Sequence, residues 1–228
     1  MSYFANKTVV VLGATGILGQ LTAHDLSQRG ADVRLIVRSP NSLASALRDL
    51  PVAVADITKR GEVAAALTAV SQGQSVDGII NCTGVVAFGN FSELSDEVAQ
   101  EVMAVNALGV INVISLATTS LNPEGFLASF TGVAADMTIA GMGAYCASKV
   151  AAKTAMGVAA RELRRQKIRV LDIRAPHTET GLITRALEGT APKMPEGLQP
   201  QAVIDRVLDA IAMGEKDLPA EAFAAENK

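Results

Sequence analysis

The sequence predicts an α/β protein built on a parallel sheet that helices cover on both faces. Short runs of β-branched residues alternate with longer Ala/Leu-rich segments, which is the pattern of strands followed by helices. The strand-like runs are almost continuously apolar, as in a doubly wound parallel sheet buried on both faces. No linker or repeat divides the 228 residues, so we expect a single domain over residues 1–228.

The expected elements follow one another in regular order. Strands are predicted at residues 7–13, 32–38, 51–57, 76–84, 124–132 and 168–176. Helices are predicted at residues 18–30, 42–50, 62–73, 95–121, 145–163 and 200–214. Pro and Gly punctuate "EGTAPKMPEGLQP", so we expect a loop there and a substrate loop or lid over residues 181–200. In such sheets ligands bind beyond the carboxyl ends of the strands, where the strand order reverses.

Composition excludes several classes of protein. Hydrophobic residues make up 49% of the chain, and the net charge is −3, so no concentrated basic face is expected to attract nucleic acid or anionic lipid. No apolar run is expected to span a membrane, and the N-terminus lacks a signal-peptide layout. These features predict a cytoplasmic protein. Two cysteines, Cys82 and Cys146, fit neither a disulfide framework nor a metal site.

The first predicted strand leads into "GATGILG", which places Gly13, Gly16 and Gly19 three residues apart. A tight turn there lets the backbone approach a pyrophosphate, and the start of the next helix supplies N–H donors and the positive end of its dipole. The strand before the turn and the helix after it favour dinucleotide binding. Close packing of a helix on a strand is the alternative explanation.

The end of the second predicted strand favours NADP over NAD. Arg38 and Ser39 stand where an NAD-selective protein would have an acidic residue, and a guanidinium forms strong bidentate bonds with a 2′-phosphate. A solvated surface arginine is the alternative. Asp56, after the third strand, is expected either to accept from the adenine amino group or to cap the following turn.

Tyr145 and Lys149 lie four residues apart on a predicted helix, so their side chains share one face. A fixed ammonium beside a phenol favours the phenolate and is expected to lower its pKa from about 10. The pair would then serve as a general acid or base near neutral pH. A half-buried tyrosine with a nearby lysine is the structural alternative, but a dinucleotide-binding pattern in the same chain disfavours it.

These motifs together resemble the short-chain dehydrogenase/reductase family over nearly the whole chain. The matching stretches are "GATGILG", "NCTG", "VNALG", "YCASK" and "RAPHTET". The resemblance implies a Rossmann fold and hydride transfer between a nicotinamide and a carbonyl or alcohol. It further implies that Tyr145 exchanges a proton with the substrate, that Lys149 binds the nicotinamide ribose, and that Asn106 holds a proton-relay water.

The resemblance also implies the cofactor contacts. Thr178 and Thr180 would face the nicotinamide carboxamide, while Asn81 and Gly84 would shape the cofactor site. The full set of expected cofactor-binding residues is Gly13, Thr15, Gly16, Ile17, Leu18, Gly19, Arg38, Ser39, Asp56, Ile57, Asn81, Cys82, Thr83, Gly84, Tyr145, Lys149, Thr178 and Thr180.

One departure from the family bears on catalysis. The family usually has a serine thirteen positions before the tyrosine, and here that position is Gly132. Thr131 is adjacent and Ser129 is close; Thr131 is included among the expected catalytic residues, although strand alternation points it to the opposite face unless the backbone bulges. A backbone N–H in its place, slow catalysis, or the loss of catalysis are the alternatives. Losing such a donor typically costs about 10²–10³ in rate.

The favoured interpretation is an NADP(H)-dependent oxidoreductase, a reductase by preference, for a small or medium, mainly apolar carbonyl compound. Its pocket is expected to be lined by "MTIAGMG" and "GLITRAL". The alternative is an NADP(H)-binding sensor or regulator without turnover, which Gly132 favours. A sugar-nucleotide epimerase or dehydratase fits the glycine spacing but would need a separate substrate domain. A homodimer or homotetramer is expected, because Ala and Gly on the Tyr145 helix allow close helix contact.

Overall fold

A computed structural model describes residues 2–226 and contains one seven-stranded parallel sheet. Its strands are β1 (Thr8–Leu12), β2 (Asp32–Val37), β3 (Val52–Val54), β4 (Val76–Asn81), β5 (Leu121–Phe130), β6 (Arg169–Ile173) and β7 (Asp217–Leu218). The strand order is β3-β2-β1-β4-β5-β6-β7. The predicted doubly wound α/β fold is confirmed. The order reverses between β1 and β4, so the loops after these two strands diverge and leave room for a ligand.

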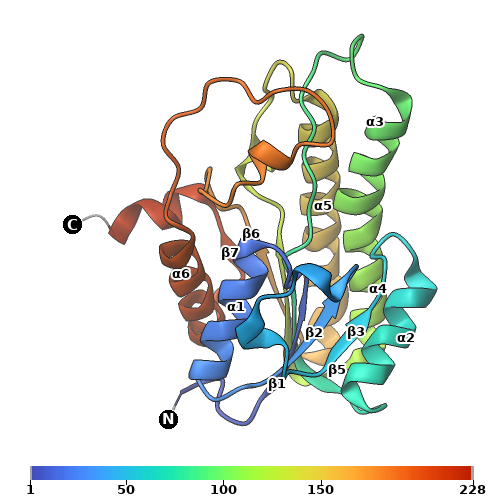
Figure 1. Ribbon diagram of the computed structural model, residues 1–228. Helices are drawn as coiled ribbons and strands as arrows, with labels where there is room; N and C mark the ends of the chain where they lie inside the picture. Colours follow the sequence, from blue (N-terminus) through green and yellow to red (C-terminus); the bar gives the residue numbers. More distant parts are fainter. Residues whose placement is uncertain (1, 227–228) are drawn as a thin grey trace.

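Helices cover both faces of the sheet (Figure 1). The helices are α1 (Ile17–Gln28), α2 (Arg60–Ser71), α3 (Asp96–Met103), α4 (Gly109–Ser120), α5 (Gly143–Glu162) and α6 (Pro200–Met213). The apolar side chains of α1 and α6 form one core with the sheet, and those of α2, α4 and α5 form a second core on the other face. The β-strands are therefore buried on both sides, which explains their continuous apolar sequence.

Two local predictions are wrong. Residues 42–50 do not form an α-helix; short 3-10 turns occupy Pro40–Ser42 and Ser45–Leu47 instead. Only Leu43 and Leu47 are buried there, and a single apolar turn cannot offset the cost of nucleating a longer helix. The second difference is an additional edge strand, β7, which pairs in parallel with β6.

The segment Asp96–Ser120 runs through α3, a π-helical turn at Ala104–Leu108, and α4. By length and composition alone this segment could cross a membrane, so the expectation that no apolar run reaches that length is wrong. Its side chains Val105, Val110 and Val113 are buried in the second core. Packing on the sheet therefore accounts for part of its apolar character.

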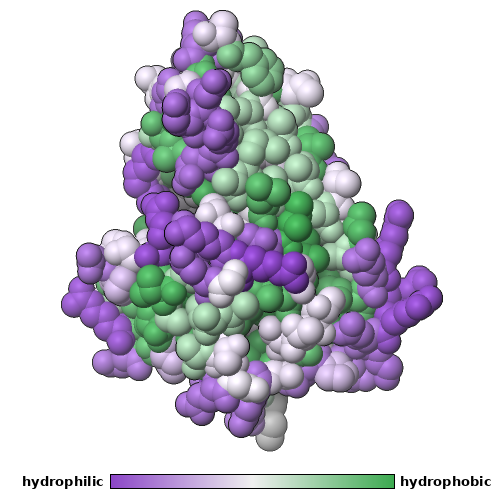
Figure 2. Space-filling model, turned by 90° about the vertical axis from the view of Figure 1, so that its right-hand side faces the viewer, coloured by the Kyte–Doolittle hydropathy of each residue, from purple (hydrophilic) through white to green (hydrophobic). Residues whose placement is uncertain are grey.

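The outer face of these helices also carries apolar side chains. Figure 2, which looks at the side of the molecule where α2, α3 and α4 lie, shows a broad green and pale green surface. The large exposed apolar residues of α3, the π-helical turn, α4 and α5 are Met103, Leu108, Ile111, Val150 and Val158.

Three segments beyond the sheet are tied together above its carboxyl end. The chain after β4 bonds to the chain after β6, with the amide of Phe88 donating to Glu188 O and the amide of Leu187 donating to Val86 O, both at 2.9 Å. The amide of Gly89 donates to Gly141 O at 2.8 Å. These backbone bonds build a wall above the strand ends without a further strand of the sheet.

Helix α1 starts pressed against the turn that follows β1. A Cβ atom at Gly19 would lie 2.3 Å from Gly13 O, and Gly13 itself has a φ of +83°. The clash would be with backbone, which cannot rotate away as a side chain can. Gly19 is thus required for this close approach of helix and turn.

We therefore expect Gly19→Ala to lower the free energy of unfolding by about 1–3 kcal/mol, the usual cost of overpacking. Gly61→Ala is the matched control, because Gly61 also lies in the first turn of a helix but has open space around its Cα. Gly61→Ala should raise the stability by roughly 0.5–1 kcal/mol. Urea unfolding followed by circular dichroism measures both; equal effects would contradict the packing argument.

Candidate active site

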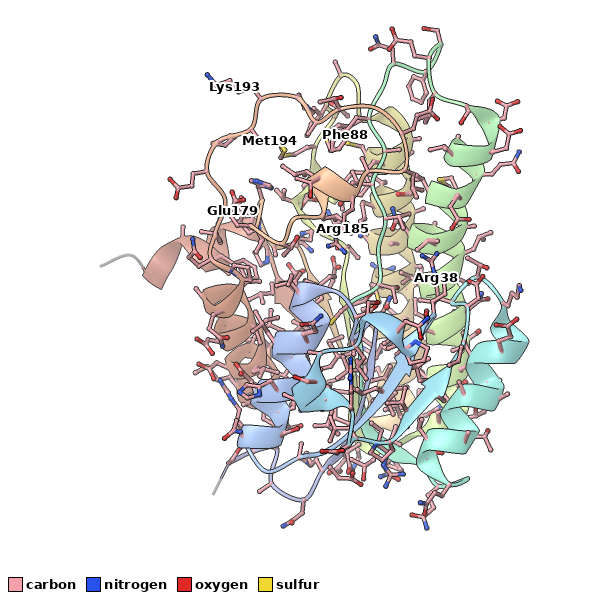
Figure 3. The ribbon with its side chains drawn as sticks, viewed as in Figure 1. Arg38, Phe88, Glu179, Arg185, Lys193 and Met194 are labelled. Carbon is pink, nitrogen blue, oxygen red and sulfur yellow. The ribbon has the colours of Figure 1, made fainter. Side chains whose placement is uncertain are left out.

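A cavity of about 880 Å³ opens at the carboxyl end of the sheet. It runs from Arg38 and Asp56, after β2 and β3, to Tyr145 and Lys149 on α5. Figure 3 shows Arg38 at the end of β2 and, above it, Phe88, Arg185 and Met194 around the upper part of the molecule. The cavity thus lies at the point where the strand order reverses, as the fold requires for ligand binding.

Most of the predicted cofactor-binding residues line this cavity. They are Gly13, Thr15, Gly16, Ile17, Leu18, Arg38, Asp56, Ile57, Cys82, Thr83, Gly84, Tyr145, Lys149, Thr178 and Thr180. They come from the turns after β1 to β4 and β6 and from α5, so segments far apart in sequence meet at one edge of the sheet. Burial raises the pKa of the Cys82 thiol to about 12, which keeps it protonated and unreactive.

Four of the other predicted residues stand behind the cavity or beside it. Gly19 packs on the first turn, and Ser39 is exposed next to Arg38. Asn81 accepts hydrogen bonds from the amide and hydroxyl of Thr83 at 3.1 and 2.7 Å. Asn106 accepts from the amide of Val85 at 3.0 Å and donates to Ser148 Oγ at 3.1 Å. The two asparagines therefore shape the loop after β4, and Asn106 joins it to α5.

Thr131 does not reach the cavity. Its side chain is fully buried, and its hydroxyl donates to Asp172 Oδ1 at 2.5 Å. Strand alternation continues past β5, so Thr131 points beneath α5 while Phe130 faces the other side. The assignment of Thr131 as the serine replacement is therefore wrong. The serine position itself, Gly132, has a φ of +78° and open space where a side chain would begin.

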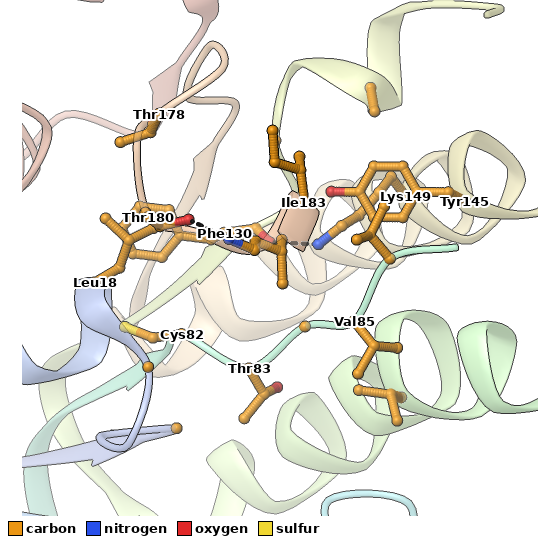
Figure 4. Close-up of a pocket in the computed structure, with 18 of the residues that line it drawn as sticks. Leu18, Cys82, Thr83, Val85, Phe130, Tyr145, Lys149, Thr178, Thr180 and Ile183 are labelled. Atoms are coloured by element: carbon orange, nitrogen blue, oxygen red, sulfur yellow. Dashed lines mark hydrogen bonds between the residues drawn. The ribbon is translucent and has the colours of Figure 1, made fainter. Parts of the chain in front are cut away.

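Tyr145 and Lys149 lie together at the inner end of the cavity (Figure 4). The Lys149 ammonium donates to Phe130 O at 3.1 Å and sits 5.7 Å from the centroid of the Tyr145 ring. The phenol packs against a cluster of buried apolar residues that includes Val86, Phe88 and Met142. The pair thus lies against hydrocarbon, with Lys149 buried and Tyr145 half-buried at the cavity wall.

The burial of Tyr145 and Lys149 determines the pKa of both groups. Burial raises the pKa of the Tyr145 phenol to about 12, because removing the phenolate from water is costly. Burial also lowers the pKa of Lys149 to about 8, against a smaller opposite effect of the Asp172 carboxylate. The expected lowering of the Tyr145 pKa is therefore wrong in this structure: burial raises it, and the Cys146 thiol adds a smaller effect in the same direction.

The cavity fits a dinucleotide. Lys149 is buried, and Phe130 O is its one hydrogen-bond acceptor among the described residues. An ammonium has three donors, so two remain for hydroxyl groups such as those of a ribose. At the start of α1, Gly16 supplies no side-chain cap and the first turn holds no acidic residue, which leaves the helix end open to an anion.

The far end of the cavity carries the charge expected for an adenosine phosphate. The Arg38 side chain is 73% exposed, and its nearest carboxylate, Glu101, lies 3.9 Å away. Asp56 accepts from the amide and hydroxyl of Thr58 at 2.9 and 2.8 Å, so it caps the turn after β3 while still lining the cavity. Hydrogen bonds from Thr58 and the charges of Lys59 and Arg38 outweigh the effect of burial and lower the pKa of Asp56.

The rest of the cavity is mainly apolar. The two stretches expected at the pocket contribute Met137, Ile139 and Met142 from one and Leu182, Ile183, Arg185 and Leu187 from the other. The Pro-rich loop adds Pro192, Lys193, Met194 and Pro195. Sequence reasoning missed Val85, Val86 and Phe88, although the apolar run directly after "NCTG" was a usable signal. It also gave Arg185 no role.

The fold and the cavity together define a Rossmann-type nucleotide-binding protein. A tyrosine and a lysine lie at the inner end of its cavity. The family model for short chain dehydrogenases matches residues 7–190. The chain therefore belongs to the short chain dehydrogenase family, whose members bind NAD(P) and act as oxidoreductases on small molecules. The resemblance inferred from the motifs is confirmed.

Individual relatives agree with this assignment. An uncharacterized oxidoreductase of Methylorubrum extorquens is 29% identical over 219 residues, covering 90% of this chain and 86% of the relative. A dehydrogenase/reductase from Anopheles gambiae is 25% identical over 93% of this chain and 74% of its own. A short chain dehydrogenase from Burkholderia cenocepacia, solved in complex with NADP, has a TM-score of 0.82 at 25% identity and covers 99% of this chain and 95% of that chain.

The depressed pKa of Lys149 makes stability depend on pH in a defined window. Between pH 8 and 10.5 the unfolded lysine keeps its proton while the folded one has lost it, so the unfolded state binds more protons and stability rises with pH. We expect the unfolding free energy of the protein, relative to Lys149→Met, to rise by roughly 3 kcal/mol across that window. Urea unfolding at several pH values checks this; a flat difference would mean that Lys149 titrates normally.

Proposed function

We propose that the protein is an NADP(H)-dependent reductase of small or medium, mainly apolar carbonyl compounds. The main support for this proposal is the Tyr145–Lys149 pair, which lies at the inner end of a cavity whose other end is lined by Arg38. A bound NADPH supplies the hydride. The apolar side chains above Tyr145, among them Phe88, Met142 and Leu182, would hold the substrate by burying hydrocarbon and excluding water.

Tyr145 acts as the proton donor in this proposal. A pKa of about 12 keeps its phenol protonated at neutral pH, which suits a group that must donate a proton to a carbonyl oxygen. The reverse reaction needs a phenolate, which burial disfavours. The protonated phenol is the form that reduction requires.

Lys149 and Asn106 support this donor from different sides. Two free N–H groups on Lys149 are suited to the ribose hydroxyls of the cofactor, and its charge favours any negative charge that develops on the phenol oxygen. Asn106 holds the loop after β4 against α5 through Val85 and Ser148, and so fixes the wall of the cavity beside the pair. The water relay expected at Asn106 remains part of the proposal.

The preference for NADP rests on Arg38. The end of β2 has no carboxylate to bond a 2′-hydroxyl, while the exposed guanidinium of Arg38, which meets Glu101 only at 3.9 Å, is suited to a 2′-phosphate. The NADP complex of the Burkholderia cenocepacia relative is consistent with this choice.

A homo-oligomer, the remaining part of the proposal, is supported by the helical face that Figure 2 shows. Leu108, Ile111 and Val150 are all more than 40% exposed, and α5 is rich in Ala and Gly. Apolar residues and small residues together suit the close packing of helices across a two-fold axis.

Replacing Tyr145 tests the function directly. Tyr145→Phe should lower NADPH-dependent turnover by about 10²–10⁴-fold, the usual contribution of a positioned proton donor, and leave NADPH affinity unchanged. NADPH consumption is measured with pooled aldehydes, ketones and quinones.

Tyr3→Phe is the matched control, because Tyr3 accepts a hydrogen bond from Arg169 far from the cavity; its turnover should equal that of the unaltered protein.

The serine position at Gly132 favours a second function, a non-catalytic NADP(H) sensor. Tight NADPH binding with no turnover on any pool would establish that alternative and contradict the reductase.

Replacing Arg38 tests the cofactor preference. Arg38→Ala should weaken NADPH binding by about ten- to a hundredfold, the value of one charged hydrogen bond, and leave NADH binding nearly unchanged. Arg48→Ala is the control, since Arg48 is exposed on the same loop but does not line the cavity. Equal losses for the two cofactors would disprove the assignment of Arg38.

A further inference from the structure

The cavity is positively charged although the protein as a whole is acidic. The chain has a net charge of −3, yet four Lys/Arg side chains and one carboxylate line the cavity: Arg38, Lys149, Arg185 and Lys193 against Asp56. Such a local excess attracts an anionic ligand. Arg38 and Lys149 have roles in the proposed function, at opposite ends of the cavity, which leaves two cations unexplained.

Arg185 is the better placed of the two. It ends a short 3-10 turn, and its Nε and Nη2 donate to the carbonyls of Gly181 and Thr180 at 3.1 and 3.3 Å. No carboxylate within residues 2–226 forms an ion pair with it. The guanidinium is thus oriented by backbone but not neutralised, and its other N–H donors remain available.

The view with side chains separates Arg185 from Lys193. In Figure 3, Arg185 lies on the inner side of the loop, below the 3-10 turn and toward the strand ends, whereas Lys193 projects outward from the top of the loop. Only Arg185 therefore faces the middle of the cavity.

The first turn of α1 lies across the cavity from this loop. Leu18 from that turn and Thr180 from the loop both line the cavity. Thr180 also supplies a carbonyl that accepts a hydrogen bond from Arg185. The helix start has neither a side-chain cap nor an acidic residue, so its amides are open to the cavity that Arg185 also lines.

We propose that Arg185 binds the diphosphate of the dinucleotide from the loop side, opposite the amides at the start of α1. This inference rests on the proposed function. A diphosphate diester carries two negative charges, whereas a helix end provides the equivalent of only about half a positive charge. Arg185 supplies the missing cation between Arg38 and Lys149, and its planar fork matches phosphate oxygens. The loop that carries it would thereby close over the bound cofactor.

Two cofactor fragments distinguish Arg185 from Arg38. ADP-ribose contains the diphosphate but no 2′-phosphate, and adenosine 2′-monophosphate contains the 2′-phosphate but no diphosphate. Arg185→Ala should weaken ADP-ribose binding by about ten- to a hundredfold and leave adenosine 2′-monophosphate binding unchanged. Arg38→Ala should do the reverse. Isothermal titration calorimetry with the full chain measures both without any substrate.

Arg48→Ala is the matched control, because Arg48 is an exposed arginine that does not line the cavity; its affinities should equal those of the unaltered protein. Unchanged ADP-ribose affinity in Arg185→Ala would overturn the proposal. Arg185 would then be assigned to binding an anionic group of the substrate instead. If the unaltered protein bound neither fragment, the proposed function would fall together with the role of Arg185. Arg185 is exposed, so its removal does not threaten folding.

Discussion

The close contact between helix α1 and the turn after β1 is the constraint on which the site depends. Gly19 lets the helix begin against Gly13 O, and the reversal of strand order next to it separates the loops after β1 and β4. The open helix end, the cavity and the loop after β4 all follow from that arrangement. A side chain at Gly19 would push the helix away and change the position of every group that meets a cofactor there.

A second constraint lies beneath α5. Arg174 pairs with Asp136, Asp172 and Asp217 at 2.6–2.7 Å, and Asp172 also accepts from Thr131. Asp136 in turn pairs with Lys153 of α5. This network, buried at Arg174 and Asp172 and exposed at Asp136 and Asp217, ties the loop after β5 to the edge of the sheet and to the helix that carries Tyr145. It uses the hydroxyl of Thr131, and removing Asp172 would leave the buried Arg174 with one partner fewer.

The electrostatics of the tyrosine follow from the apolar wall rather than from the lysine. Hydrocarbon around Tyr145 keeps its phenol protonated, and the same enclosure destabilises the Lys149 ammonium. The Lys149 ammonium therefore carries a cost in the folded protein that a bound ligand with hydroxyl groups can offset, whereas the neutral phenol carries no such cost near neutral pH. Asn106 and the ion pairs around Arg174 hold Tyr145 and Lys149 in a single geometry.

The parallel sheet, the glycine turn, the family and the position of a tyrosine and a lysine on one helical face could be predicted from the chain, because apolar periodicity and residue spacing are local properties. Four features emerged only from the folded arrangement: residues 42–50 do not form a helix, Thr131 turns to Asp172, the phenol pKa rises, and Arg185 faces the cavity. Burial, the partners of a side chain and the path of a loop depend on residues distant in the chain, which spacing alone does not encode.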